Sequence, residues 1–312
     1  MTNGLIEPPE QGVYPDVPMD TYHRWDAASS SQLNKLSKSP AHLRAYRDEE
    51  YEETEALSLG RIIHKAVLEP ELFEEQFTVL GQCEATKGDG ERCSYSAKYV
   101  TPDHEHLCGT HGSEDQQDES VKTVKEDHME TARGIIDSIE QSDSAKAMLR
   151  GAGESEYSYT WVDPKTGVKC KARMDRYSPE VPGGAIVDLK TTRDASPDRF
   201  RKDIFNYTYY LQAALYLRGA QALDRDLDHF VIVAVEKKPP YGVQVYRISD
   251  ALTKEVKGQL NDLLYLYSAC MENDEWPGYP DEIRDISVPS WAHDKIEDQR
   301  NEIVNHIRRI EQ

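Results

Sequence analysis

The stretch from residue 154 to residue 190 constrains the fold of this chain most strongly. Aromatic and polar residues alternate over 154–162, a turn signal follows at 163–167, and 168–177 has the pattern of a returning strand. After a Pro-Gly-Gly turn, the apolar run 185–190 predicts a short buried strand. Three consecutive strands of this kind predict a single sheet.

Residues that can do chemistry stand at the ends of two of these strands. Asp175 closes the returning strand, and Asp188 and Lys190 close the buried strand on one of its faces. Two carboxylates and an ammonium at one sheet edge can hold a divalent cation and activate a water beside it. The pattern therefore predicts hydrolytic phosphate chemistry of the kind that nucleases perform.

Two predicted helices carry polar residues that fit the same chemistry. The helix predicted over 57–68 carries His64, and the one over 204–222 carries Gln212 and Tyr216, which share a helix face. Each also has a structural explanation, since His64 fits a packed core histidine and Gln212 and Tyr216 fit a pair covering the sheet. Their occurrence beside two strand-end carboxylates favours a functional site.

The order of the predicted elements gives an α/β fold with a central mixed sheet flanked by helices. A helix is also predicted over 121–140, and the first dozen polar, Pro-rich residues predict a loose arm. We expect five parts along the chain: an N-terminal arm (1–24), the first part of the main domain with the His-bearing helix (25–81), a Cys/His insertion (82–120), the rest of the core (121–275) and a C-terminal helical tail (276–312).

Charge limits the range of functions. The formal net charge is −20 over 312 residues, which argues against a protein that coats DNA, because such proteins usually show a basic stripe. It does not exclude an enzyme that confines basic residues to a channel, where bound metal adds positive charge. The candidate DNA-binding residues, each of which also fits an ordinary solvated side chain, are Arg61, Lys65, Arg193 and Lys202.

The sequence shows no membrane or export signal. No apolar run is long enough to span a bilayer, and no signal peptide is present. We therefore expect a cytoplasmic protein without membrane contact.

The motifs occur in the order found in one nuclease family. Gly60–His64 resembles the Gly-x-x-x-His motif of RecB-type nucleases of the PD-(D/E)XK superfamily, and Gln212–Tyr216 resembles their Gln-x-x-x-Tyr motif. Asp175 and Asp188-Leu-Lys190 resemble the central motifs of that family. One departure is Ala172, where RecB-type members often carry Gly.

Two longer segments resemble one group of nucleases within this superfamily. Ser29–Leu36 and Leu59–Pro70 look more closely like the nuclease domain of RecE (exonuclease VIII) and its phage relatives. The likeness covers residues 25–80 and 150–270. It implies a PD-(D/E)XK nuclease core with a small insertion.

The resemblance also implies a role for each motif residue. Lys190 would orient or deprotonate the attacking water, and Gln212 and Tyr216 would position the scissile strand. The implied ligands of Mg²⁺ or Mn²⁺ are His64, Asp175, Asp188 and the carbonyl of Leu189.

A RecE-like enzyme would degrade linear double-stranded DNA from an end, 5′ to 3′, and leave a 3′ single strand. The resemblance implies a homo-oligomeric ring around the DNA and a RecT-like single-strand annealing protein as partner, in a phage protein acting inside its bacterial host. Two alternatives stay open. One is another PD-(D/E)XK enzyme, either RecB- or Cas4-like in end processing or a structure-specific endonuclease, and the other is a catalytically silent DNA-end-binding scaffold.

Residues 82–120 lack apolar periodicity and contain a Cys/His series with ligand spacing. Cys83-x9-Cys93-x14-Cys108-x2-His111 offers three thiolates and an imidazole, enough for a closed tetrahedral structural Zn²⁺ site. The segment is too polar to bury a core, so a metal would stabilise it. It resembles small zinc-binding modules of phage proteins. His104 and His106 are alternative ligands, and a loop with free thiols is the alternative reading.

Overall fold

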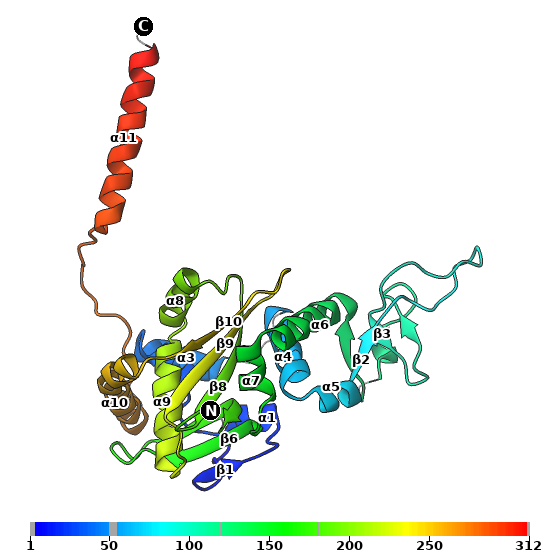
Figure 1. Ribbon diagram of the computed structural model, residues 1–312, viewed down its shortest axis with the longest axis horizontal. Coiled ribbons are helices and arrows are strands. Elements are labelled where there is room, and N and C mark those ends of the chain that lie inside the picture. Colours follow the sequence, from blue (N-terminus) through cyan, green and yellow to red (C-terminus); the bar gives the residue numbers. More distant parts are fainter. Residues whose placement is uncertain (1–3, 50–54, 119, 180, 311–312) are drawn as a thin grey trace. The chain divides into compact units, whose positions relative to one another are not determined.

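The computed structural model describes residues 4–49, 55–118, 120–179 and 181–310 (Figure 1). The chain forms two compact units, Met1–Pro277 and Gly278–Gln312.

A six-stranded mixed sheet forms the centre of the first unit and confirms the predicted α/β fold. Its order is β1-β6-β7-β8-β9-β10, and neighbours are antiparallel except β8 and β9, which run parallel. The strands are β1 (Gly12–Tyr14), β6 (Ser155–Val162), β7 (Lys169–Ser178), β8 (Ala185–Thr192), β9 (His229–Glu236) and β10 (Val243–Arg247). The parallel pair lies inside the sheet, between β7 and β10, with both faces covered, which explains its nearly unbroken apolar sequence.

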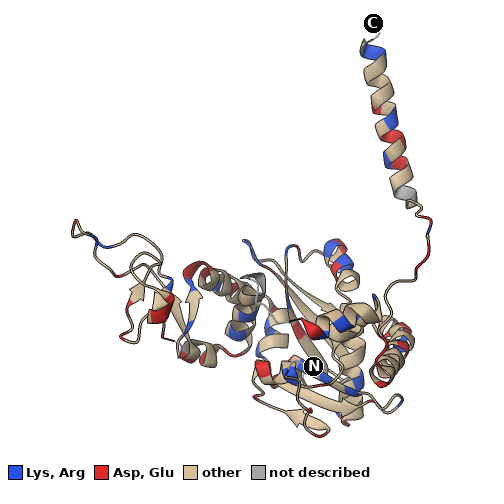
Figure 2. Ribbon diagram, turned by 180° about the vertical axis from the view of Figure 1, so that it is seen from behind, with Lys and Arg blue, Asp and Glu red and all other residues tan. Residues whose placement is uncertain are grey.

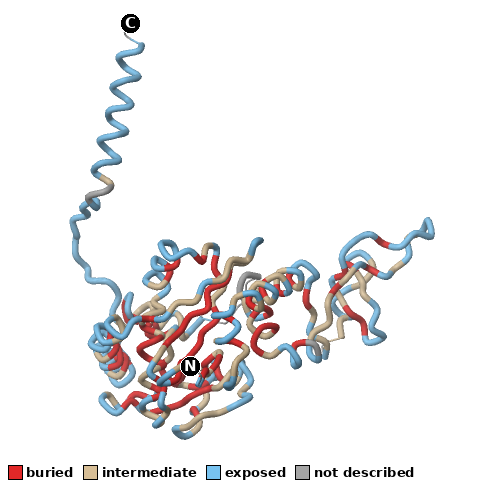
Figure 3. The backbone as a smooth tube through the Cα atoms, in the orientation of Figure 1, coloured by how far each residue is buried: buried red, intermediate tan, exposed pale blue. Residues whose placement is uncertain are grey.

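Helices cover both faces of this sheet (Figure 1). One face packs against α2 (Ser30–Leu36), α3 (Pro40–Asp48), α9 (Tyr209–Ala222) and α10 (Asp250–Asn273). The other packs against α4 (Glu55–Leu68), α6 (Glu126–Gln141) and α7 (Asp143–Arg150). Figure 3 shows buried residues along the central strands, between the two helical layers.

The strand alternation divides the residues of β8 between these layers. Val187 and Leu189 belong to the core under α4 and α6, whereas Ile186 belongs to the core under α9. Because side chains alternate along a strand, Asp188 and Lys190 project toward the α9 side. This places the motif residues beneath α9.

Residues 82–118 extend away from the central sheet, beyond a short pair of parallel strands (Figure 1). After α5 (Pro70–Gln76), β2 (Phe77–Leu80) pairs in parallel with β5 (Lys122–Lys125). Their connection contains the antiparallel pair β3 (Tyr99–Val100) and β4 (His106–Leu107) and the 3-10 helix η1 (Glu114–Gln116). Its apolar packing is small, with Leu80, Ala97 and Val100 buried together.

The structure differs from the sequence prediction in three elements. Instead of one helix over 204–222, α8 (Pro197–Asn206) precedes α9, because Thr208 between them adopts a left-handed φ of 56°. The helix predicted from 121 begins at Glu126, since the preceding four residues pair with β2. The expected N-terminal arm contains β1 and α1 (Met19–Arg24), and β1 adds to the edge of β6.

The second unit contains α11 (Ser290–Ile310). Several of its aliphatic side chains are exposed, and they fall on one stripe because their spacing is seven, four and three residues. These are Ile296, Ile303, Ile307 and Ile310. In the part of the chain that the structure describes, no helix is both long and apolar enough to cross a membrane.

The close packing of α9 on the sheet can be tested at Gly219. A Cβ added there would lie 2.7 Å from Cζ3 of the fully buried Trp161. Gly219→Ala should therefore lower the free energy of unfolding by about 1–3 kcal/mol, as overpacked cores do. Gly258→Ala, on α10 with no atom within 4 Å of the added Cβ, is the matched control. It should raise stability by about 0.5–1 kcal/mol in urea denaturation.

Candidate active site

The two motif carboxylates meet where β7 and β8 separate. The register between these strands runs from Ser178↔Ala185 to Arg176↔Val187. Two positions further along β8, the backbone N–H of Leu189 donates to Oδ2 of Asp175 at 2.7 Å instead of to a strand carbonyl. The Asp175 side chain thus takes the place of a backbone acceptor and is fixed beside β8.

Asp188 is held from two sides on the α9 face of β8. Gln212 Nε2 donates to Asp188 Oδ1 at 2.7 Å, and Lys190 Nζ lies 2.7 Å from Oδ2. Asp188 is only 2% exposed, so its charge needs these partners. Lys190 Nζ also lies 4.9 Å from the ring centroid of Tyr209, which lines the same space.

His64 and Glu156 form a second set of donor atoms with Asp175, and Glu156 is not among the residues predicted from the sequence. His64 Nδ1 lies 3.5 Å from Asp175 Oδ2. One donor atom each of His64, Asp175 and Glu156 lies within 4.8 Å of the others. Glu156 in turn accepts a hydrogen bond from Arg173 Nε at 2.6 Å.

The register of the β6–β7 hairpin could have indicated that Glu156 lies beside Asp175. Ser155 pairs with Arg176 and Tyr157 pairs with Met174, so Glu156 stands opposite Asp175 across β6 and β7. The turn at 163–167 fixes this register in the sequence, and counting back from it places the two carboxylates together. The left-handed φ of 60° at Glu156 marks a local distortion of β6 that sequence alone does not specify.

The electrostatics of the site favour a bound cation. Burial and the neighbouring Asp188 raise the pKa of Asp175 to about 7. Burial and Asp175 likewise raise the pKa of Glu156. Burial and the charge of Lys190 lower the pKa of His64, which keeps its imidazole neutral. Crowded carboxylates beside a neutral imidazole are a donor set that fits a divalent metal ion.

Lys190 remains a cation in these surroundings. Burial by itself would lower the pKa of Lys190, but the charges of Asp188 and Asp175 outweigh burial and raise that pKa above its ordinary value. An ammonium is therefore present beside Asp188 at neutral pH.

The remaining motif residue and the basic candidates have different surroundings. Tyr216 is buried, its ring meets Phe230 edge-on at 6.0 Å, and burial raises the pKa of Tyr216 to about 12. Lys65 Nζ is 2.7 Å from Oε2 of Glu69, so its charge is already compensated. The other candidates are exposed to solvent: Arg61, Arg193 and Lys202. Figure 2 shows basic and acidic segments interspersed over the first unit.

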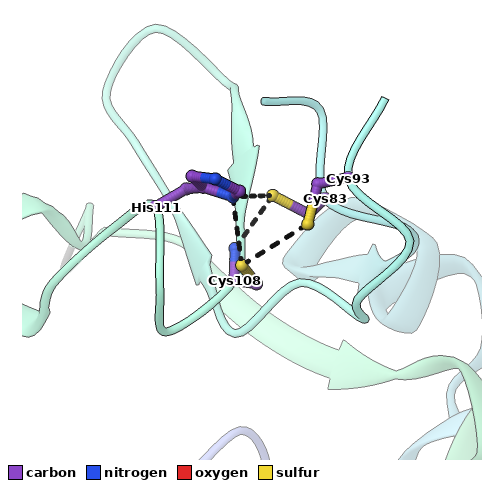
Figure 4. Close-up of side chains that lie close together, drawn as sticks. All are labelled: Cys83, Cys93, Cys108 and His111. Atoms are coloured by element: carbon purple, nitrogen blue, oxygen red, sulfur yellow. Dashed lines mark hydrogen bonds between the residues drawn. The ribbon is translucent and has the colours of Figure 1, made fainter. Parts of the chain in front are cut away.

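The insertion brings its three cysteines and His111 into one cluster (Figure 4). Cys93 and Cys108 sulfurs lie 3.9 Å apart, and His111 Nδ1 lies 3.6 Å from Cys83 Sγ and 3.4 Å from Cys108 Sγ. A tetrahedral ion with metal–sulfur bonds of about 2.3 Å has ligand–ligand edges of about 3.8 Å. The cluster therefore has the dimensions of a four-ligand metal site.

Backbone groups prepare one of these thiols for a metal. Burial opposes ionisation of Cys108, but the backbone N–H groups of Thr110 and His111 outweigh it and lower the pKa of Cys108 to about 6. The Cys108 N–H also donates to Cys83 Sγ at 3.3 Å. Thiolates are the form of cysteine that binds metals.

Residues 29–287 match the family model described as a PDDEXK-like domain of unknown function (DUF3799). The chain belongs to this PDDEXK-like family. No curated protein matches the sequence.

Among solved structures, the chain is similar to a crystal structure from Eubacterium rectale described as a candidate exonuclease. The TM-score is 0.53 at 17% identity, over 88% of this chain and 96% of that chain. At this identity the likeness shows the fold alone. A second structure, of SSO0001, matches 43% of this chain and 60% of that chain at 16% identity, and its TM-score of 0.25 supports no argument.

The family assignment and the fold agree with the resemblance to PD-(D/E)XK nucleases. The structure brings Asp175, Asp188 and Lys190 together with His64 and Gln212. Leu189 takes part through its N–H, and the role of its carbonyl as a metal ligand stays a prediction.

Binding of a divalent cation by this PDDEXK-like site should depend on pH. Since the pKa of Asp175 is raised from about 4 in unfolded chains to about 7, its contribution to stability is full below pH ~4 and is lost as pH rises through ~7. Protons and a cation then compete for the same oxygens. Mn²⁺ should thus raise the melting temperature more at pH 8 than at pH 5.5. At an Mn²⁺ concentration 100-fold above the dissociation constant, the gain in free energy of unfolding should reach about 2.7 kcal/mol.

Differential scanning fluorimetry at the two pH values measures this effect. Asp175→Asn keeps the shape of the side chain and removes its charge, so this variant should lose most of the stabilisation. Equal stabilisation at both pH values, or full stabilisation of Asp175→Asn, would contradict the assignment.

Proposed function

We propose that this protein is a divalent-metal-dependent exodeoxyribonuclease that degrades linear double-stranded DNA from an end. The observation that carries the proposal is the contact of Lys190 and Gln212 with Asp188, beside the donor group of His64, Glu156 and Asp175. This arrangement has the parts that phosphodiester hydrolysis needs, namely hard ligands and a cation whose charge reaches them.

The residues divide the chemical work among them. A bound Mg²⁺ or Mn²⁺ would neutralise the phosphate and lower the pKa of a water. His64, Asp175 and Glu156 have donor atoms close enough to hold such an ion, with Asp188 beside them. Because its raised pKa keeps Lys190 protonated, this residue suits orienting the water and stabilising developing negative charge better than accepting a proton.

Gln212 fits a positioning role. Its amide donates to Asp188 Oδ1 and leaves Oδ2 to Lys190. It thereby fixes the rotation of the carboxylate, and Tyr216 packs one helical turn further along α9. Both residues would keep the scissile strand in line with the donor group.

The polarity and the biological role follow the resemblance to RecE. We propose 5′ to 3′ digestion that leaves 3′ single strands for phage homologous recombination in a bacterial host cytoplasm. A RecT-like single-strand annealing protein would take up the product. The family match and the fold of the structure from Eubacterium rectale support a nuclease core.

We also propose that the enzyme acts as a homo-oligomer, ultimately a ring. A single subunit with a net charge of −20 repels DNA over roughly a Debye length, about 8–10 Å at ordinary salt, and converging basic residues from several subunits would overcome this. The exposed aliphatic stripe of α11 suits a second copy of the same helix. Its first half carries Asp294, Glu297 and Asp298 together with Lys295 and Arg300, and its last turn carries Arg308 and Arg309. An antiparallel pair would bring these opposite charges together, and a monomer in sedimentation velocity would contradict it.

Zinc is the metal that we propose for the cysteine cluster. Its donors, three sulfurs and one imidazole, match a structural zinc site.

We expect elemental analysis to find about one zinc per chain, retained in an Asp188→Asn variant. Cys83→Ser with Cys108→Ser should lose the zinc and make residues 82–118 sensitive to protease, because little apolar packing supports them. A zinc-free protein with a protease-resistant insertion would contradict this.

Digestion of matched DNA substrates tests the main proposal. In Mg²⁺ or Mn²⁺, the protein should degrade a linear duplex and leave the covalently closed form of the same plasmid intact. Cleavage of closed circles would instead favour a structure-specific endonuclease, and binding of ends without cleavage would favour a silent scaffold.

Two variants link this activity to the site. Asp188→Asn should abolish digestion, and Lys190→Ala should reduce its rate by roughly 10²–10⁴-fold, the usual size of such contributions. Both should keep the melting profile of a folded protein. Full activity in either one would refute the assignment of these residues.

A further inference from the structure

A series of aromatic rings leads from the core to the surface beside Lys190. Tyr246 stacks on Phe200 with centroids 5.0 Å apart, Phe200 meets Tyr209 at 6.2 Å, and Tyr209 meets Tyr207 at 5.7 Å. The Phe200 ring of this series lies in the core, since Phe200 is 1% exposed. The last ring is open to solvent, since Tyr207 is 58% exposed.

The break between α8 and α9 fixes Tyr207 in this place. The Tyr207 N–H donates to the Asp203 carbonyl at 2.9 Å at the end of α8. Thr208 follows with a left-handed φ of 56°, and its Oγ1 donates to the Tyr207 carbonyl at 2.7 Å. The backbone on both sides of the ring is thus tied down, so a ligand that stacks on Tyr207 meets a largely ordered surface.

A second exposed ring stands beside this series. Phe205 is 53% exposed and lies 5.5 Å from the ring of Tyr210, on the same turn. Large aromatic side chains are costly to leave in water. Two of them on one turn, next to a candidate active site, indicate a surface that is covered during function.

The position of the rings relative to Lys190 points to the ligand. Lys190 Nζ lies 4.9 Å from the ring centroid of Tyr209. The Tyr209 ring in turn contacts the ring of Tyr207. Four cationic side chains on and just before α8 are exposed to solvent: Arg193, Arg199, Arg201 and Lys202. Arg199 and Arg201 pair with acids of the same helix, whereas Arg193 and Lys202 form no ion pair with the residues that the structure describes. Flat rings close to exposed cations match a single-stranded nucleic acid, which presents π-faces and phosphates together.

We propose that Tyr207, with Phe205 two residues before it in the chain, is a stacking platform for an unpaired base next to the scissile phosphate. The proposal rests on the proposed nuclease function and specifies the form of DNA that the site accepts. A base can stack on Tyr207 only when it has left its duplex partner. The enzyme therefore engages a single-stranded or frayed end, and a short overhang is a better ligand than a blunt end.

The test compares DNA ends that differ in their bases alone. Three labelled duplexes are used, one blunt, one with a three-nucleotide single-stranded overhang, and one with the same overhang made of abasic nucleotides. Dissociation constants are measured by fluorescence anisotropy without added Mg²⁺ or Mn²⁺ and without a chelator, so that the comparison does not require cleavage and leaves the cysteine cluster intact. Overhangs at 5′ and 3′ ends are measured separately.

The expected result is a dependence on the base and on the ring together. Stacking of one base on one ring changes affinity by roughly 5- to 150-fold, so wild-type protein should bind the normal overhang tighter than the abasic one by such a factor. Tyr207→Ala should lose most of this factor and bind the abasic overhang as wild type does. Tyr207→Phe, which keeps the ring, should retain it.

A matched control separates this effect from the loss of any exposed tyrosine. Tyr265 on α10 is 54% exposed, and its hydroxyl contacts the carbonyl of Lys165 in the β6–β7 turn. Tyr265→Ala should leave the preference for base-bearing overhangs unchanged. Phe205→Ala should reduce the preference less than Tyr207→Ala, because Tyr207 belongs to the series that reaches Lys190.

The outcomes distinguish this proposal from the nuclease proposal. Equal losses on normal and abasic overhangs, no loss in Tyr207→Ala, or no measurable DNA binding would overturn the platform, and the first two would point to a protein partner for these rings. Base-dependent binding without digestion in Mg²⁺ or Mn²⁺ would support the platform and refute the nuclease activity. Digestion without base dependence would do the reverse.

Discussion

The hydrogen bond from the Leu189 N–H to the Asp175 carboxylate is the interaction on which the site depends. It forms where β7 and β8 stop pairing, and it satisfies a backbone donor that would otherwise be buried without a partner. The same carboxylate lies 3.5 Å from His64 on the opposite side of the sheet from α9. One side chain thereby connects the α4 layer, the hairpin and β8, and the positions of Glu156 and Asp188 follow from it.

The cost of this arrangement is visible in its charges. Asp175, Glu156 and Asp188 are crowded in a largely buried space, and the pKa of Asp175 rises to about 7 through burial and Asp188. Lys190, Gln212 and Arg173 offset part of the repulsion through direct contacts. A site built for stability would not gather acids in this way, whereas a site that binds a cation must. The chain therefore combines an acidic surface with a centre prepared for positive charge.

Two further features depend on departures from regular structure. The left-handed Thr208 splits the expected long helix, and the resulting turn exposes Phe205 and Tyr207. The Tyr207 ring contacts Tyr209, which lies next to Lys190. The insertion has little apolar core, and its three cysteines and His111 lie at the distances of a metal tetrahedron. In both places function is inferred from a segment that ordinary packing would not explain.

The sequence by itself determined the local parts of this protein. The β6–β7 hairpin, the buried β8 strand and the order of Asp175, Asp188, Lys190 and Gln212 follow from alternation, turn signals and spacing, which act between near neighbours. The resemblance to PD-(D/E)XK nucleases added the correct fold, which the family match confirms. The tertiary structure decided what depends on segments distant in the chain: the addition of β1 to the sheet edge, the parallel pairing of β2 with β5, and the meeting of His64 with Glu156 and Asp175. These features could not be predicted because the free energy of each pairing depends on which partner surface the rest of the fold leaves open.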